Sequence, residues 1–219
     1  MRKPIRVHAW GDYALFSRPE LKSERYTYDV ITPSAARGIL DAVYYHPGLA
    51  WKIDRIYVQN PIRFTNVRRN EVSQKISCSN LLEAVNGSTK PLYIDRADSI
   101  AQRAATILRD VSYVIEAHFE LIPEKMGGDD SEDKFYAIFM NRLKKGRHFT
   151  QPYFGCREFT AMVKEYDGGD TPRTIIDDRD LGLTLYDMDY SDPENIHPLF
   201  FRAYMRSGVV DVAGCEVIG

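Results

Sequence analysis

The sequence contains little cysteine and no long hydrophobic run. Its three cysteines, Cys78, Cys156 and Cys215, are odd in number and far apart, so neither a disulfide framework nor a CxxC pair is available. No stretch of about 18 apolar residues occurs, which argues against a membrane-spanning helix. The chain enters a strand-like pattern at Ile5 without an apolar secretory segment, so we expect a cytoplasmic protein without membrane contact.

Several catalytic signatures are also missing. The sequence has no HExxH, Walker A, GxGxxG or GxSxG pattern. Two groups of aspartates could offer oxygen ligands to Mg²⁺, but their loop-like, glycine-containing surroundings favour solvated acidic turns. These groups are Asp129, Asp130 and Asp133, and Asp177, Asp178 and Asp180. We therefore expect neither a metal site nor a cofactor.

The net charge of −2 gives no global signature of nucleic-acid binding, so any contact with phosphate depends on local patches. Arg63, Arg68 and Arg69 bracket Phe64, and a second basic run precedes Phe149. Cations interleaved with aromatic rings can hold an RNA backbone and stack its bases, whereas an isolated charged run is usually a solvated surface. Because the chain has two such runs, an RNA-binding surface and a solvated charged surface are about equally supported. The second run comprises Lys144, Lys145, Arg147 and His148.

One helix has clear local signals at both ends. Thr32 is suited to cap it, Pro33 to occupy its first position, and Pro47–Gly48 to end it. Apolar residues at helical spacing predict a buried stripe on the helix over residues 33–45. Gly38 in its interior is about 1 kcal/mol less favourable than alanine, and a close packing contact is one explanation for it.

The remaining apolar patterns predict an α+β fold. Strands are expected at 5–10, 51–58 continuing to 62–67, 104–122 and 153–163, and a second helix at 132–149. With an inserted hairpin or loop at 70–100, this βαββαβ order is that of ferredoxin-like domains, which include RNA-recognition modules. Short strands at 181–186, 199–205 and 209–212 predict a small C-terminal antiparallel β-domain. We therefore divide the chain into residues 1–166 and 167–219.

The stretch 111–121 places chemistry on a strand. Its alternation puts Tyr113, Ile115 and Phe119 on one face and Glu116 and His118 on the other, so one side is expected to be buried and the other polar. An imidazole beside carboxylates on a rigid strand is either a solvated sheet face or an acid–base site.

A phenol and an imidazole near one phosphodiester suffice for RNA cleavage. A base removes the proton of the 2′-OH, the oxygen attacks phosphorus, and an acid protonates the departing 5′-oxygen to leave a 2′,3′-cyclic phosphate. Histidine suits either role because imidazoles titrate near neutrality. Tyr44, late in the predicted helix, and His118 are the candidates. Their spacing alone does not decide the matter.

Four stretches together resemble a known family. They are Gly11–Phe16 (GDYALF), Tyr28–Leu40 (YDVITPSAARGIL), Pro61–Phe64 (PIRF) and Tyr153–Phe159 (YFGCREF). In combination they resemble the subtype I-C (Dvulg) CRISPR-associated proteins of the Cas-five family, over about residues 4–165. The resemblance implies a ferredoxin-like RAMP domain followed by a C-terminal β-domain.

The resemblance also implies an activity. Such proteins are metal-independent endoribonucleases that cut the repeat hairpin of precursor CRISPR RNA and stay on the 5′ handle as a Cascade subunit. The family's catalytic tyrosine matches Tyr44 and its histidine matches His118, while Glu116 stands at the position of its lysine, with reversed charge. That reversal favours an alternative, a non-catalytic RNA-binding scaffold within the type I-C surveillance complex.

The expected partners follow from the same resemblance. They are the precursor CRISPR RNA repeat hairpin, other type I-C Cascade subunits and, as a further candidate, double-stranded DNA. The residues expected to bind RNA are the two basic runs and one arginine of the first helix: Arg37, Arg63, Arg68, Arg69, Lys144, Lys145, Arg147 and His148.

Overall fold

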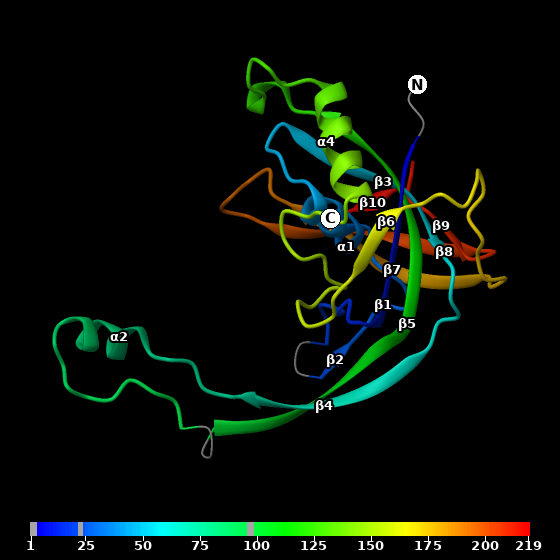
Figure 1. Ribbon diagram of the computed structural model, residues 1–219. Coiled ribbons are helices and arrows are strands. Elements are labelled where there is room, and N and C mark those ends of the chain that lie inside the picture. The colour runs from blue at the N-terminus through cyan, green and yellow to red at the C-terminus, as the bar shows by residue number, and fades with distance from the viewer. Residues whose placement is uncertain (1–3, 22–23, 96–98) are drawn as a thin grey trace.

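A computed structural model describes residues 4–21, 24–95 and 99–219 (Figure 1). The predicted α+β class is confirmed. In chain order the elements are β1 (Ile5–Ala14), β2 (Arg25–Tyr26), α1 (Pro33–Val43), β3 (Leu49–Val58), β4 (Phe64–Val72), α2 (Cys78–Val85), β5 (Ile100–Leu121), η1 (Pro123–Lys125), α4 (Glu132–Lys144), β6 (Met162–Glu165), β7 (Arg179–Asp189), β8 (His197–Arg206), β9 (Val209–Asp211) and β10 (Val217–Ile218).

Helices α1 and α4 form where their caps and apolar spacing direct. The Thr32 hydroxyl accepts a hydrogen bond from the amide of Ala35 at 3.2 Å, and the Ser131 hydroxyl accepts one from Lys134 at 3.2 Å. Each helix buries one stripe of apolar side chains against the sheet. The second helix was predicted to reach residue 149, but it ends at Lys144 because the chain turns into the left-handed region at Gly146 (φ 59°).

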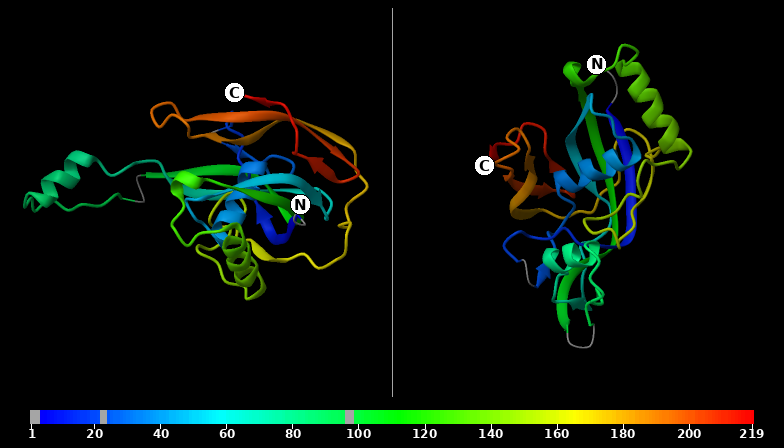
Figure 2. Two further views of the ribbon diagram at one scale, coloured as in Figure 1. Left: turned by 90° about the horizontal axis from the view of Figure 1, so that it is seen from above. Right: turned by 90° about the vertical axis from the view of Figure 1, so that its left-hand side faces the viewer.

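The strands form one sheet, ordered β10-β8-β9-β3-β5-β1-β6, in which β5 runs antiparallel to both β1 and β3. Helices α1 and α4 lie on one face, here called the inner face, and the segment between β6 and β7 crosses the other, the outer face (Figures 1 and 2). The hydrophobic core fills the space between the sheet and the two helices.

The predicted alternation on β5 is confirmed for its inner face, where Ile115 and Ala117 are fully buried. The outer face differs from the expectation, since Val114 and Glu116 are also buried. Residues 166–175 cover them: the amide of Ile175 bonds to the carbonyl oxygen of Val58 at 3.0 Å, and Arg6 binds the same segment.

The inserted segment is a long arm. Strand β4 pairs with the first half of β5 from Phe64 opposite Leu108 to Val72 opposite Ile100, and this hairpin projects from the sheet with α2 near its tip (Figure 1). The hairpin was expected over 70–100, but α2 was not. None of its residues is buried, so α2 packs against no part of the hydrophobic core that the structure describes.

The predicted strand at 153–163 is wrong for most of its length. Only Met162–Glu165 is a strand, and the preceding residues form a loop with one bridge between Tyr153 and Thr160. Gly155 has a φ of 77°, which lets the loop turn tightly and insert the fully buried ring of Phe154 into the core. A buried aromatic residue in a loop gives the same sequence pattern as the buried face of a strand, and the prediction was wrong for this reason.

The C-terminal strands are antiparallel, as expected. β7 pairs with β8, and β9 pairs with both β8 and β3, so these strands continue the main sheet. The division at residues 166 and 167 stays a prediction. No helix in the described ranges is long and apolar enough to cross a membrane.

Candidate functional site on the outer face of the sheet

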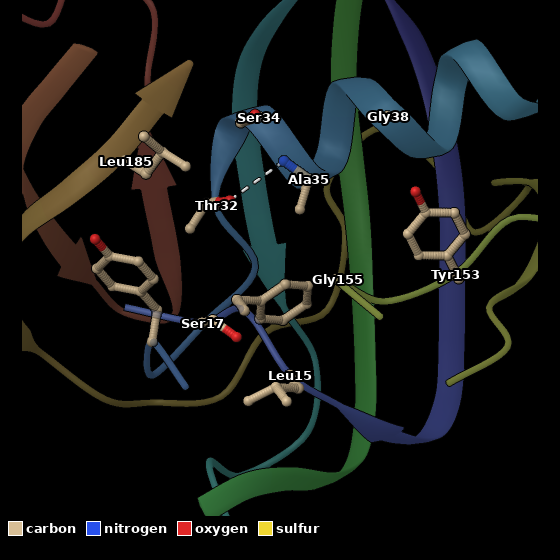
Figure 3. A pocket seen from close by; sticks show the side chains of 11 residues that line it. Leu15, Ser17, Thr32, Ser34, Ala35, Gly38, Tyr153, Gly155 and Leu185 are labelled. Atoms are coloured by element: carbon tan, nitrogen blue, oxygen red, sulfur yellow. Dashed lines mark hydrogen bonds between the residues drawn. The ribbon is translucent and has the colours of Figure 1, made fainter. Parts of the chain in front are cut away.

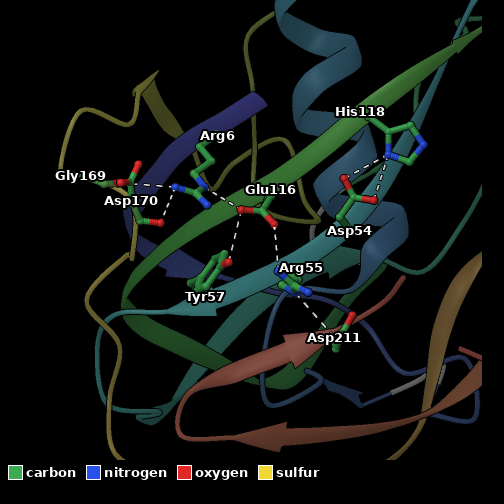
Figure 4. A network of polar contacts seen from close by, with 9 residues as sticks. All are labelled: Arg6, Asp54, Arg55, Tyr57, Glu116, His118, Gly169, Asp170 and Asp211. Atoms are coloured by element: carbon green, nitrogen blue, oxygen red, sulfur yellow. Dashed lines mark hydrogen bonds and ion pairs between the residues drawn. The ribbon is translucent and has the colours of Figure 1, made fainter. Parts of the chain in front are cut away.

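Polar side chains from three adjacent strands meet on the outer face (Figure 4). Strand β5 contributes Glu116 and His118, and the register places Arg6 of β1 and Arg55 of β3 on either side of Glu116. Lys52 of β3 lies directly opposite His118. These groups are far apart in the sequence, and the antiparallel pairing brings them together.

Glu116 is an almost fully buried carboxylate, 4% exposed. Arg6 Nε donates a hydrogen bond to it at 2.6 Å, the Tyr57 hydroxyl donates one at 3.3 Å and Arg55 Nη1 one at 3.4 Å. Burial raises the pKa of the Tyr57 phenol, and the neighbouring Glu116 carboxylate raises it further. Arg6 also donates to the carbonyl oxygen of Asp170 at 2.6 Å. Glu116 is therefore the centre of a structural network rather than a solvated surface group.

His118 is held by Asp54. Its Nδ1 lies 2.9 and 3.0 Å from the two carboxylate oxygens, which cannot donate, so Nδ1 carries the proton and Nε2 is left for other contacts. A register shift between Ile53 and Arg55 marks an irregularity of β3 at Asp54. The His118 side chain is 53% exposed. An aspartate that orients an exposed imidazole is an arrangement suited to proton transfer at Nε2.

Tyr44 lies elsewhere. It directly follows α1, is buried on the inner face and packs against Phe135 of α4, with the guanidinium of Arg142 5.0 Å from its ring centre. Burial raises the pKa of its phenol, while Arg142 acts in the opposite direction. The sheet separates Tyr44 from His118, so the structure does not bring the two predicted catalytic rings together. The catalytic role of Tyr44 stays a prediction.

Arg37 is tied into the fold. Its guanidinium donates two hydrogen bonds to Asp187 of β7, at 2.6 and 2.8 Å, and one to Asp41 at 2.8 Å. The hydrogen bonds that Arg37 donates to Asp187 raise the pKa of Arg37, with burial opposing them. These contacts join α1 to β7.

The first basic run lies at the base of the arm. Arg69 pairs with Glu158 at 2.6 Å and stacks over the ring of Phe159, Arg63 lies 3.7 Å from Asp110, and Arg68 is exposed. The arm therefore offers Arg68 and the half-exposed Arg63 to a partner.

The second basic run is exposed, and its Lys144 pairs with Glu165 of β6 at 3.7 Å. Its members Lys144, Lys145, Arg147 and His148 lie at the end of α4. The amide of Phe149 bonds to the carbonyl oxygen of Ala42 at 2.8 Å, which fixes this end of α4 beside the end of α1. There Phe149 stacks on Tyr45, with ring centres 6.4 Å apart, and both rings are more than half exposed.

Sequence analysis missed Asp54, Lys52, Arg6 and Tyr57 of the outer-face site and Tyr45 of the aromatic pair. Alternation along β3 signals Lys52, but the irregularity at Asp54 breaks the pattern there. Tyr45 follows Tyr44 in the sequence, and only the contact between α1 and the end of α4 distinguishes it.

Comparison with known proteins places the chain in a family. It is 48% identical over 218 residues, covering 97% of this chain and 96% of the relative, to the CRISPR pre-crRNA endoribonuclease Cas5d of Mannheimia succiniciproducens. It is 35% identical, covering 95% and 90%, to the protein of the same name from Thermus thermophilus.

The fold is similar to those of solved structures. One described as a CRISPR-associated protein is 22% identical, with a TM-score of 0.69, and covers 99% of this chain and 97% of that one. A chain of a CRISPR RNA-guided surveillance complex is 12% identical, with a TM-score of 0.53, and covers 99% and 89%. Residues 5–213 match the Cas5d family of CRISPR-associated proteins. The chain therefore belongs to the Cas5d family of CRISPR-associated proteins.

Proposed function

We propose that this protein is the endoribonuclease that cleaves the repeat hairpin of precursor CRISPR RNA. Both curated relatives carry that activity in their names, and together they cover nearly the whole chain. The observation that carries the proposal is the exposed His118 imidazole held by Asp54 on the outer face. The reaction requires no metal ion in this proposal, because the nucleophile is the RNA's own 2′-OH.

His118 Nε2 removes the proton of the 2′-OH, and the resulting oxygen attacks the adjacent phosphorus. The bond from phosphorus to the 5′-oxygen breaks, and that oxygen takes a proton from water, giving a 2′,3′-cyclic phosphate and a 5′-OH. Asp54 keeps the proton on Nδ1 and stabilises the imidazolium that forms. Lys52 lies across from His118, and among the described residues it pairs with Glu120 at 3.7 Å. The two side chains are 46% and 61% exposed, so the Lys52 ammonium can turn to the developing phosphorane charge.

Glu116 has a positioning role in this proposal. Its carboxylate holds Arg6 and Arg55 on the outer face, and Arg55 also pairs with Asp211 at 3.6 Å. In this proposal the half-exposed Lys52 and Arg55 supply the positive charge that a lysine at position 116 would give.

The RNA is retained by a second surface. The exposed run Lys144, Lys145, Arg147 and His148 contacts phosphates, and the Tyr45–Phe149 pair stacks unpaired bases of the 5′ handle. Retention on the handle makes the protein a Cascade subunit that contacts other type I-C subunits. Similarity to a chain of a surveillance complex supports the fold this role requires.

We infer that the main domain is ferredoxin-like. In chain order β1, α1, β3, β5, α4 and β6 give the βαββαβ sequence, and the strands lie side by side as β3-β5-β1-β6. That order supports a RAMP-type domain followed by a C-terminal β-domain.

A non-catalytic scaffold is the second candidate. It is favoured by one observation: the Tyr44 ring is buried on the inner face, away from His118, so the two expected catalytic groups do not share a site. A scaffold would bind the same RNA by the same basic surface and release no product.

Incubation of the protein with its cognate repeat RNA in EDTA tests the proposal. We expect one cut that yields a 2′,3′-cyclic phosphate, and its loss in His118→Ala. His197→Ala is a matched control, because His197 also faces an aspartate, Asp189 at 3.9 Å, but lies on β8. It should cut normally, and so should Tyr44→Phe. Uncut RNA with tight binding identifies the scaffold, and unchanged cutting by His118→Ala refutes the assignment of the site.

A further inference from the structure

A cavity of about 350 Å³ lies between α1, the end of β1 and the loop that precedes β6 (Figure 3). Small-ligand pockets usually measure about 300–1,000 Å³. Leu15 and Phe16, Tyr28, the first turns of α1, Tyr153 with Gly155, and Leu185 of β7 surround it. These segments are far apart in the sequence, and none of them belongs to the outer-face site or to the basic runs.

Gly38 indicates that this space is kept open. A glycine inside a helix is about 1 kcal/mol less favourable than alanine, and a packing contact was one explanation for it. The structure excludes that explanation for the described residues, since a Cβ added at Gly38 meets no atom within 4 Å. Its backbone does not require glycine either, because its φ is not positive. Gly38 is exposed, so the space beside it is open to solvent, and the absent Cβ lets a ligand approach the helix backbone there.

The lining is aromatic and uncharged. Phe16, Tyr28 and Tyr153 supply the aromatic rings, and the Tyr153 hydroxyl points toward α1 (Figure 3). Ser17 and Tyr153 are exposed, and their hydroxyls have no hydrogen-bond partner among the described residues. A hydroxyl can donate or accept, which suits the mixed donors and acceptors on the edge of a neutral ring.

Positive charge lies beside the cavity and not in its lining. Arg157 is exposed two residues after Gly155. The guanidinium of Arg18 lies 4.5 Å from the centre of the Tyr28 ring and also pairs with Asp29 at 3.4 Å and Glu20 at 3.8 Å. A ligand with a neutral planar part and an anionic part matches this distribution. One nucleotide of an RNA strand has that chemistry, with its base inside and its phosphate outside.

We propose that this cavity takes one unpaired base of the bound CRISPR RNA, flipped out of the strand and packed beside Gly38 and Tyr153. The proposal rests on the proposed function for the identity of the RNA. It goes further in assigning a base-binding site that is separate from the cutting site and from the basic runs. An apolar side chain of a partner subunit is the competing occupant, but it would leave the two hydroxyls without partners.

Affinity for repeat RNA tests the proposal, measured with 2′-fluoro RNA that cannot be cut by 2′-OH attack. Gly38→Leu fills the cavity, and we expect about tenfold weaker binding, the size expected for one lost stacked base. Gly128→Leu is the matched control, because Gly128 also has open space and no positive φ but lies in the loop before α4. Tyr153→Ala removes a half-exposed ring without filling the cavity and should weaken binding similarly; it keeps the test valid if Gly38→Leu does not fold.

A series of RNAs that each lack one base identifies the occupant. We expect one abasic RNA to bind the natural protein about tenfold more weakly and to show no further loss with Gly38→Leu. The proposal is overturned if Gly38→Leu and Tyr153→Ala both bind intact RNA as tightly as the natural protein does. It is also overturned if Gly38→Leu weakens the binding of every abasic RNA as much as it weakens that of intact RNA. Normal RNA affinity with lost assembly into the surveillance complex also overturns it, in favour of a protein side chain. Binding without cutting would refute only the proposed enzyme, whereas no binding of repeat RNA by the natural protein would refute both.

Discussion

Replacement of Glu116 by lysine restores the charge that the family resemblance implies at this position, yet the structure predicts that it will destabilise the protein. Glu116 is 4% exposed and accepts hydrogen bonds from Arg6, Arg55 and Tyr57. Removing one member of a buried ion pair costs about 3–5 kcal/mol because the remaining charge is left uncompensated. Arg6 and Arg55 are 23% and 47% exposed, so water screens part of the uncompensated charge. We therefore expect the lost ion pairs to lower the free energy of unfolding by about 3 kcal/mol.

The new ammonium adds repulsion from two guanidinium groups. Two like charges 4 Å apart repel by about 4 kcal/mol at an effective dielectric constant of 20. A lysine side chain can turn away from the two guanidinium groups, so we include only about 1 kcal/mol of this repulsion. The total for Glu116→Lys is then about 4 kcal/mol, out of the 5–15 kcal/mol that stabilises a typical domain. Glu116→Gln keeps an acceptor for the Tyr57 hydroxyl and should cost about 2 kcal/mol.

Urea unfolding followed by circular dichroism measures both changes. With a slope of about 2–3 kcal/mol per molar urea, Glu116→Lys should lower the midpoint by about 1.5 M. The matched control is Glu120→Lys, the same change four residues away on the outer face, where the side chain is 61% exposed. It should change stability by less than about 0.5 kcal/mol. The network does not stabilise the fold as described if the free energy of unfolding of Glu116→Lys lies within about 1 kcal/mol of that of the natural protein, with an unchanged dependence on urea concentration.

Three further predictions concern the site and the fold. Asp54→Asn should lower the single-turnover cleavage rate about 100-fold, because His118 loses the carboxylate that orients it, while filter binding shows unchanged RNA affinity; an unchanged rate would exclude Asp54 from the reaction. Arg37→Ala should cost about 2 kcal/mol in urea unfolding through lost charge-assisted hydrogen bonds to Asp187, and a large loss of RNA affinity at undiminished stability would instead support its predicted RNA contact. Gly155→Ala should destabilise by about 3 kcal/mol, because φ is 77° and the added Cβ overlaps the carbonyl oxygen of Leu15; thermal melting within 2 °C of the natural protein would contradict that.

The elements with strong local signals were predictable. Helix α1 has a capping threonine, a proline at its first position and apolar residues at helical spacing, and it forms where these direct. Strand β5 shows clear alternation, and its inner face is buried as expected. The loop at 151–161 was not predictable, because Phe154 is buried by a tight turn at Gly155, and periodicity cannot distinguish that burial from a strand's.

The site was predictable only in part. Periodicity treats Glu116 and His118 alike, since both lie on the outer face of β5. Their environments differ because of partners more than 50 residues away: Arg6 and Tyr57 bury Glu116, whereas Asp54 binds His118 and leaves it exposed. Such pairings depend on strand register, which no local pattern in the sequence specifies.

In the proposed function, the outer face of the sheet cuts the RNA, and the surface beside the helices on the inner face binds it. His118 lies on the outer face, whereas Tyr45, Phe149 and the second basic run surround the end of α1 with the helices on the inner face. A single phosphodiester cannot contact both surfaces, so residues of one should govern the cleavage rate and residues of the other the affinity for the handle. Tyr44 lies within the second group, next to Arg142, and its expected effect is therefore on binding or stability. A Tyr44→Phe variant that binds normally but cuts as slowly as His118→Ala would show that the two rings meet during the reaction, and that the sheet or α1 rearranges when RNA binds.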